Sequence, residues 1–220
     1  MKTDTLIFSD VHLGSKDCHP NKLLNILKKI KAKRIIIAGD LFDHHNLHRL
    51  KKEHWKVLSK LRKLSKKCNI IYLIGNHCFL KAEFMSILLG FKCQNDYVLK
   101  YDKLKILVVH GDIFDIFFTK YKSITNIVIK IYYTIRKYTP FADEFFKIFK
   151  NKTNDFVEKS SDVKRNAIKY IDLNSYDSII CGHTHMPEHS ERYVNCGSFC
   201  EDECSYVTID KKGKIRLDFC

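Results

Sequence analysis

The chain has 220 residues, of which 45% are hydrophobic and 29% are charged. This balance excludes a disordered chain, and the counts of 8 glycines and 3 prolines exclude collagen and low-complexity sequence. One compact domain over residues 1–220 is expected, since single cores grow to roughly 250 residues before they divide. The net charge of +14 favours anionic partners such as phosphorylated metabolites, nucleic acid or an anionic membrane face, although solubility alone also explains it.

The sequence shows no membrane span and no export signal. Charges such as Lys120, Lys130 and Arg136 interrupt the longest apolar stretches before they reach the roughly 18 residues of a span. Segment 1–10 contains Asp4 and too short an apolar run for a signal peptide. The 9 cysteines are an odd number without a disulfide pattern, which indicates reduced thiols. We therefore expect a cytoplasmic protein, with peripheral contact to the inner face of the membrane as an option.

Apolar runs alternate with helical patterns through the first half of the chain. This rhythm is typical of an α/β sheet flanked by helices. The expected elements, in chain order, are a strand at 5–8, a helix at 23–30, a strand at 34–38, a helix at 57–64, a strand at 70–74, a helix at 81–89 and a strand at 106–109.

Four further short strands are predicted in the last third of the chain. They lie at 178–181, 193–195, 205–209 and 215–219, with Gly213 in a turn between the last two. We expect them to form a second, more antiparallel sheet that packs on the first. The predicted fold is a two-sheet α/β sandwich flanked by helices.

Residues 113–170 interrupt the series of strands. Apolar residues at helical spacing over 124–135 and aromatic residues over 141–149 predict helices in this range. We expect a helical cap inserted over the edge of the sheet, which lines an apolar substrate pocket or touches a membrane surface. The alternative is that these helices complete the core.

Metal-binding residue types follow five of the predicted strands. Because the functional crevice of an open α/β sheet lies beyond the carboxyl ends of its strands, we expect these side chains to converge. Two carboxylates, one amide and four imidazoles suit manganese, iron or zinc, and seven ligands fit two divalent ions that share a bridging carboxylate. Taken singly, each of these residues also fits a purely structural role in a turn, a helix cap or the core. The seven candidates are Asp10, His12, Asp40, Asn76, His110, His183 and His185.

Five short segments contain these ligands: SDVHLG (9–14), GDLFD (39–43), GNHC (75–78), HGD (110–112) and GHTH (182–185). They resemble the signature blocks of calcineurin-like metallophosphoesterases. The resemblance implies the metallophosphoesterase fold and a metal-dependent hydrolase of phosphoric esters or anhydrides. The implied ligand sets are Asp10, His12 and His185 for one metal, Asn76, His110 and His183 for the other, and Asp40 as the bridge.

His77 and Asp43 are the candidate catalytic residues. His77 directly follows a ligand, so its ring is expected near the ions without binding them. The resemblance implies that His77 donates to a phosphoryl oxygen and that the Asp43 carboxylate orients its ring. Cys78 stands where the family most often has an acid, and we expect activity to survive because no ligand is lost.

Three segments resemble the UDP-2,3-diacylglucosamine pyrophosphatases of lipid A biosynthesis: HGDIFD (110–115), CGHTHMPE (181–188) and YVNCGSF (193–199). This implies cleavage of the pyrophosphate bond of a nucleotide-linked lipid, with the acyl chains held by the cap. Lys164 and Arg165 are candidate contacts for the diphosphate or sugar, or form a solvated helix face. The chain departs from that group at His77, where the group has arginine, and at Ser198 and Phe199.

Two other functions stay open. A phosphodiesterase acting on nucleic acid or on small molecules is one, because five lysines form a stripe that would follow a phosphate backbone, although a solvated face also explains the stripe. These are Lys52, Lys56, Lys60, Lys63 and Lys67. A non-catalytic interaction protein is the other, and the complete ligand set argues against it. No obligate protein partner is inferred.

Overall fold

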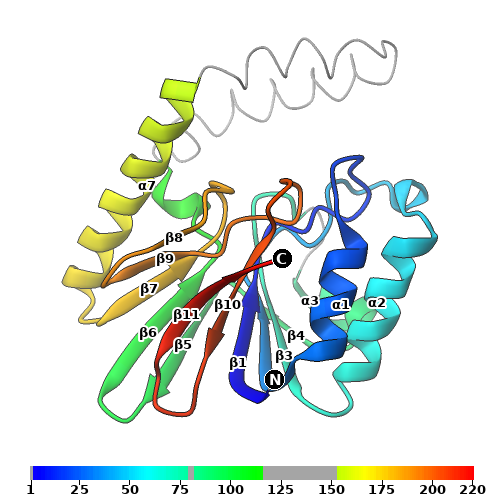
Figure 1. Cartoon of the computed structure of the whole chain (residues 1–220), viewed down its shortest axis with the longest axis horizontal. Coiled ribbons are helices and arrows are strands. Elements are labelled where there is room, and N and C mark those ends of the chain that lie inside the picture. Colours follow the sequence, from blue (N-terminus) through cyan, green and yellow to red (C-terminus); the bar gives the residue numbers. More distant parts are fainter. Residues whose placement is uncertain (1, 79–81, 116–152) are drawn as a thin grey trace.

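A computed structural model describes residues 2–78, 82–115 and 153–220 (Figure 1). Two mixed β-sheets pack face to face, and helices cover their outer faces. The expected two-sheet α/β sandwich is confirmed. None of the helices in these described ranges is long and apolar enough to cross a membrane.

The first sheet has the strand order β11-β10-β1-β2-β3-β4. Strands β1 to β4 pair in parallel, and β10 and β11 add antiparallel strands on the other side of β1. Helices α1 (Pro20–Lys29), α2 (Lys52–Leu64) and α3 (Ala82–Leu89) lie on its outer side. The strands are β1 (Lys2–Phe8), β2 (Lys31–Ile37), β3 (Asn69–Leu73), β4 (Lys92–Gln94), β10 (Ser205–Ile209) and β11 (Ile215–Phe219).

The second sheet has the strand order β5-β6-β7-β9-β8. Its outer face packs against α7 (Thr153–Leu173). Two short 3-10 helices, η1 (Leu47–Arg49) and η2 (Asp112–Phe114), precede α2 and follow β6. The strands are β5 (Asp96–Tyr101), β6 (Leu104–Val109), β7 (Ser178–Cys181), β8 (Glu188–His189) and β9 (Tyr193–Asn195).

The central strands are buried on both faces, which explains their continuous apolar runs. On one face, Ile7 and Ile36 meet Val108 and Ile180 of the opposite sheet. The other face of the first sheet packs against α1 and α2, which bury their apolar stripes there. This double packing fixes the ends of the strands, where the candidate ligands lie.

The sheet assignment of three predicted strands was wrong. The strands β10 and β11 extend the first sheet through β1, whereas β6 belongs to the second sheet. Pairing partners far apart in sequence decide sheet membership, and the apolar pattern of a single strand does not encode its partner. The second sheet is also not mainly antiparallel as expected, since β7 pairs in parallel with β6 and β9. Strands β4, β5 and β8 were not predicted, since each is short or partly exposed.

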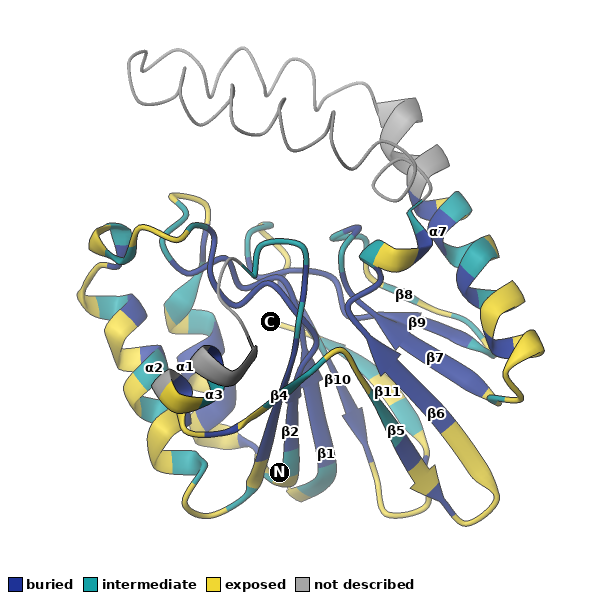
Figure 2. Ribbon diagram, turned by 180° about the vertical axis from the view of Figure 1, so that it is seen from behind, coloured by how far each residue is buried: buried dark blue, intermediate teal, exposed yellow. Residues whose placement is uncertain are grey.

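The expected cap over 113–170 is described only in part. Residues 116–152, which include the apolar stripes at 124–135 and 141–149, lie outside the described residues. Within α7, Val163, Ala167 and Ile171 are buried against the second sheet (Figure 2). The later part of α7 therefore belongs to the packed sandwich.

Candidate metal centre

The carboxyl ends of five strands meet at the upper edge of the two sheets in Figure 1. Asp10, Asp40 and Asn76 follow β1, β2 and β3 of the first sheet. His110 follows β6 of the second sheet, and His183 and His185 follow β7. The structure thus brings all the predicted ligands to one edge, as expected from the strand pattern.

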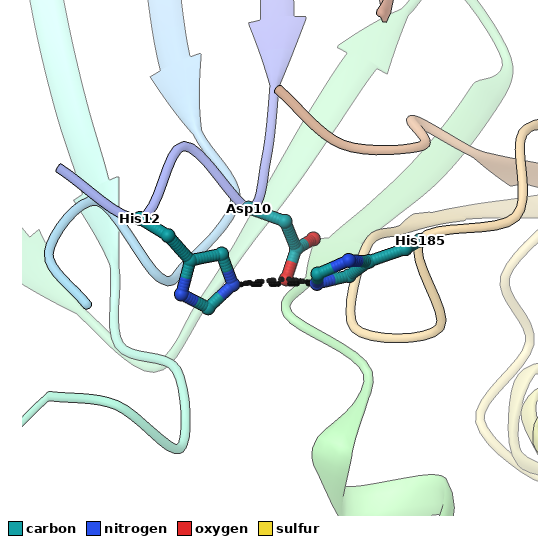
Figure 3. Close-up of side chains that lie close together, drawn as sticks. All are labelled: Asp10, His12 and His185. Atoms are coloured by element: carbon teal, nitrogen blue, oxygen red, sulfur yellow. Dashed lines mark hydrogen bonds and ion pairs between the residues drawn. The ribbon is translucent and has the colours of Figure 1, made fainter. Parts of the chain in front are cut away.

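Asp10, His12 and His185 form the first group of donors (Figure 3). Asp10 Oδ1 lies 3.7 Å from His12 Nε2 and 3.3 Å from His185 Nε2. Oδ1 is buried, and within the described ranges it has no hydrogen-bond donor. Since a buried acceptor without a donor is costly, this atom fits a cation bound between the three side chains.

A second group of donors surrounds the amide oxygen of Asn76. Asn76 Oδ1 lies 2.9 Å from His110 Nε2 and 3.0 Å from His183 Nδ1. Asp40 Oδ2 lies 3.2 Å from the same nitrogen of His110. Donor atoms of Asp10, Asp40 and His110 lie within 4.8 Å of one another, so the two groups adjoin. The set offers two neighbouring positions for divalent ions.

Each of the four imidazoles faces an acceptor on its outward nitrogen. At hydrogen-bond distance such an acceptor holds the ring proton on the outward side and turns the other nitrogen inward as a ligand. The Asp43 carboxylate lies beyond that distance from His12 and favours the same arrangement by its charge alone. The outward contacts are His12 Nδ1 to an Asp43 carboxylate oxygen at 3.8 Å, His110 Nδ1 to the Ala38 carbonyl at 2.9 Å, His183 Nε2 to Asp115 Oδ2 at 3.2 Å and His185 Nδ1 to Glu201 Oε1 at 3.5 Å.

Asp115 and Glu201 were not singled out from the sequence. Asp115 closes the HGDIFD segment, whose resemblance to a known motif was the available signal. Glu201 precedes β10 and approaches His185 through the fold. The sequence around Glu201 carries no local signal for this contact.

The ligand loops have an unusual backbone. Five candidate ligands have positive φ angles between 45° and 70°, a region that costs non-glycine residues roughly 1–3 kcal/mol each. Strain of this kind clusters at functional sites because the surrounding packing must maintain it. These residues are Asp10, His12, Asp40, His183 and His185.

Charges stabilise one another inside the centre. Burial opposes ionisation of Asp40, but His110 and neighbouring imidazoles outweigh it and hold its pKa well below the usual range. Burial likewise lowers the pKa of His110, while the carboxylates of Asp40 and Asp10 raise it to about 10. The site therefore favours positive charge beside its two aspartates, which a bound divalent cation would supply.

His77 lies beside the first group, with its ring centroid 4.8 Å from that of His12. Its backbone N–H donates to Asp40 Oδ1 at 2.9 Å, and its Nδ1 lies 2.9 Å from the main-chain carbonyl of Asp43. Because a carbonyl only accepts, Nδ1 carries the ring proton there. The sequence suggested the Asp43 carboxylate for this role. That carboxylate pairs with Arg49 at 2.7 Å, and one of its oxygens lies within 4.8 Å of a His77 ring nitrogen.

Lys164 and Arg165, the candidate substrate contacts, lie on α7, and each forms an ion pair with an acidic side chain. Lys164 Nζ bonds the Glu188 carboxylate and lies 5.9 Å from the ring centre of Tyr193. Arg165 pairs with Asp162 one turn earlier on α7. Their role toward substrate stays a prediction.

Two solved structures have a similar fold. An archaeal phosphodiesterase aligns over 98% of this chain and 99% of its own length, with a TM-score of 0.52 and 16% identity. Yfce, a phosphoesterase from E. coli, aligns over 97% of each chain, with a TM-score of 0.50 and 16% identity. At this identity the likeness shows the fold alone. A search of curated proteins found no match.

One sequence family matches most of the chain. Its profile, described as calcineurin-like phosphoesterase, aligns with residues 4–187. This span contains all seven candidate ligands together with Asp43 and His77. The chain therefore belongs to the calcineurin-like phosphoesterase family and is a metal-dependent phosphoester hydrolase.

Proposed function

We propose that this enzyme cleaves a phosphodiester or pyrophosphate bond at a centre of two divalent cations. The observation that carries the proposal is the pair of adjoining donor groups, joined through Asp10 and Asp40. Manganese is the preferred occupant, with iron or zinc as alternatives, because carboxylate, amide and imidazole donors are mixed. When bound, such ions polarise a phosphoryl oxygen and lower the pKa of water.

The residues of the chain have separate roles in binding the ions and in contacting the substrate. Asp10, His12 and His185 would hold one ion, Asn76, His110 and His183 would hold the other, and Asp40 would serve both. His77 is fixed at Nδ1 by the Asp43 carbonyl, so its Nε2 is the nitrogen that faces a phosphoryl oxygen. The form that donates there is the imidazolium, which carries a proton on each ring nitrogen. Arg49 holds the Asp43 carboxylate and so stabilises this arrangement.

A nucleotide-linked lipid is the finer substrate proposal. It is supported by the resemblance of segments 110–115, 181–188 and 193–199 to UDP-2,3-diacylglucosamine pyrophosphatases. The apolar residues that would hold acyl chains fall in 116–152, outside the described residues. Peripheral contact with an anionic membrane surface would accompany such a substrate.

The test compares substrates on manganese-loaded protein. Bis-p-nitrophenyl phosphate, p-nitrophenyl phosphate and UDP-2,3-diacylglucosamine are assayed in parallel with the wild type and Asp40→Ala. We expect hydrolysis of a diester or of the pyrophosphate, and its near-complete loss in Asp40→Ala. Glu191→Ala, which removes an exposed acid, is the control and should keep full activity. Hydrolysis of the monoester alone would contradict the proposal.

A further inference from the structure

More than half of the net positive charge of the chain falls in one segment that begins beside the metal centre. Nine of the 39 lysines and arginines lie in residues 44–67, and Glu53 is the one acid of that segment. The segment thus contributes eight of the fourteen net positive charges. It begins directly after Asp43 and includes η1 and α2. A general solubility requirement would not gather the charge in one place.

The outward face of α2 carries a row of lysines. Lys52, Lys56, Lys60 and Lys63 lie at i, i+4, i+8 and i+11, which places them on one side of the helix. The opposite side buries apolar residues, including Val57 and Leu61. In the part of the chain that the structure describes, none of these four lysines forms an ion pair with an acid. We call this set the lysine row.

Trp55 lies next to the lysine row and is 50% exposed. It is the single tryptophan of the chain. An exposed indole costs hydrophobic free energy unless a partner covers it, and tryptophan is the preferred aromatic surface for stacking and cation contacts. The combination of one exposed ring with a row of ammonium groups indicates a ligand that has both flat rings and negative charges.

The first turn of α2 lies at the same edge of the sheet as the metal centre. β2 ends at this edge, and β3, which is parallel to β2, begins at the opposite edge. The connecting helix α2 therefore runs away from the centre (Figure 1). Arg49, just before α2, contacts Asp43 at 2.7 Å. Trp55 and Lys52 thus lie at the end of α2 that is nearest to the candidate ligands.

We propose that the lysine row and Trp55 bind single-stranded nucleic acid, whose phosphodiester groups are then presented to the metal centre. This inference rests on the proposed cleavage of a phosphodiester, and it takes nucleic acid in place of the nucleotide-linked lipid as the substrate. Non-specific single-strand binding combines basic residues along the backbone with aromatic rings on which bases stack, and α2 offers both. A membrane-surface helix would need a broad apolar stripe facing outward, whereas α2 directs its apolar stripe into the core.

Binding is measured on metal-free protein in EDTA, so that no strand is cleaved. The probe is an oligothymidylate of about 12 nucleotides, a length within the known range of single-strand sites. Because Trp55 is the single tryptophan, quenching of tryptophan fluorescence reports stacking directly. We expect quenching and an affinity that falls steeply as salt concentration rises.

Two variants and a matched control locate the surface. By fluorescence anisotropy of a labelled strand, Trp55→Ala should weaken binding roughly 5- to 100-fold. The double variant Lys52→Glu, Lys56→Glu should weaken binding and reduce the salt dependence. Lys211→Glu, Lys212→Glu makes the same charge change in the β10–β11 turn, at the opposite edge of the sheet, and should have a much smaller effect.

Failure of this inference is separable from failure of the proposed function. All these variants should hydrolyse bis-p-nitrophenyl phosphate at the wild-type rate, since they change no candidate ligand. Absence of quenching by the strand, or equal weakening in the Lys211, Lys212 control, would overturn the nucleic-acid surface. A tryptophan response to phosphatidylglycerol vesicles without any response to oligothymidylate would also overturn it, in favour of a membrane surface.

Discussion

The Nε2 atoms of His12 and His185 lie only 3.3 Å apart. Both rings have a carboxylate on the Nδ1 side, from Asp43 and Glu201 respectively. If each ring proton is on Nδ1, two lone pairs face each other beside Asp10 Oδ1. A cation removes this repulsion, because it attracts all three atoms at once. This relationship is the strongest local argument for a bound metal.

The first expectation concerns His77. His77→Ala should lower turnover roughly 10²- to 10⁴-fold, as the loss of a positioned proton donor does. Both ions should remain, because His77 is not among the candidate ligands. Steady-state kinetics measures the turnover, and elemental analysis of the same sample measures the metal content. An unchanged turnover would remove His77 from the mechanism.

The outward carboxylates should control metal affinity. Glu201→Gln should weaken the ion held by His185, and Asp115→Asn the ion held by His183, each roughly 10- to 100-fold. Calorimetric titration with Mn²⁺ measures the affinity of each variant for both ions. Glu203→Gln is the control, since Glu203 is an exposed acid in the same loop as Glu201. Equal affinities in all three variants would show that the outward contacts do not position the ligands.

Metal binding should release a proton from His110. The pKa of this residue is lowered by burial but raised to about 10 overall by Asp40 and Asp10, so the metal-free ring is charged at pH 7. A histidine binds a metal only as the neutral imidazole, so affinity should rise as pH increases from the ordinary value of 6.5 toward about 10. The stability that the charged ring gives the metal-free protein should be lost over the same interval.

Calorimetry in buffers of different ionisation enthalpy counts the released protons. Thermal unfolding of the metal-free protein across this pH range provides the second readout. A binding enthalpy that is independent of the buffer would contradict the assignment of His110 as a ligand that exchanges its proton for a metal.

Gly75 should be intolerant of any side chain. An added Cβ would lie 2.2 Å from Asp40 Oδ1 and 2.9 Å from the Asp40 backbone nitrogen, and the backbone cannot give way cheaply. Gly75→Ala should displace Asp40 and weaken metal binding while the strands remain folded. Circular dichroism and metal titration check this pair of outcomes. Wild-type affinity in Gly75→Ala would show that Asp40 does not need its present position.

Local patterns predicted the parts of the fold that depend on local chemistry. The strand 178–181 has the predicted bounds, and the turn containing Gly213 connects β10 to β11. Sheet membership depends on contacts distant in sequence, such as Thr5 opposite Ile209, and periodicity does not encode them. This is why β10 and β11 were assigned to the wrong sheet.

The candidate site was also predictable only in part, namely for the residues that directly follow strands. Asp10 and Asp40 follow apolar runs, so strand ends alone place them at one edge. Asp115 and Glu201 reach their histidines from other loops. Which ring nitrogen of His183 or His185 points inward depends on these long-range contacts. The sequence therefore predicted which candidate ligands converge, and it predicted Asp43, but it did not predict Asp115 and Glu201 as the acids that face His183 and His185.

The central claim is that the adjoining donor groups hold two divalent cations. Elemental analysis of protein loaded with Mn²⁺ and then dialysed measures this directly, with Asp40→Ala in parallel. We expect two equivalents of manganese per wild-type chain and at least one fewer in Asp40→Ala. A wild-type chain that retains no metal, or an Asp40→Ala variant that retains both ions, would contradict the account.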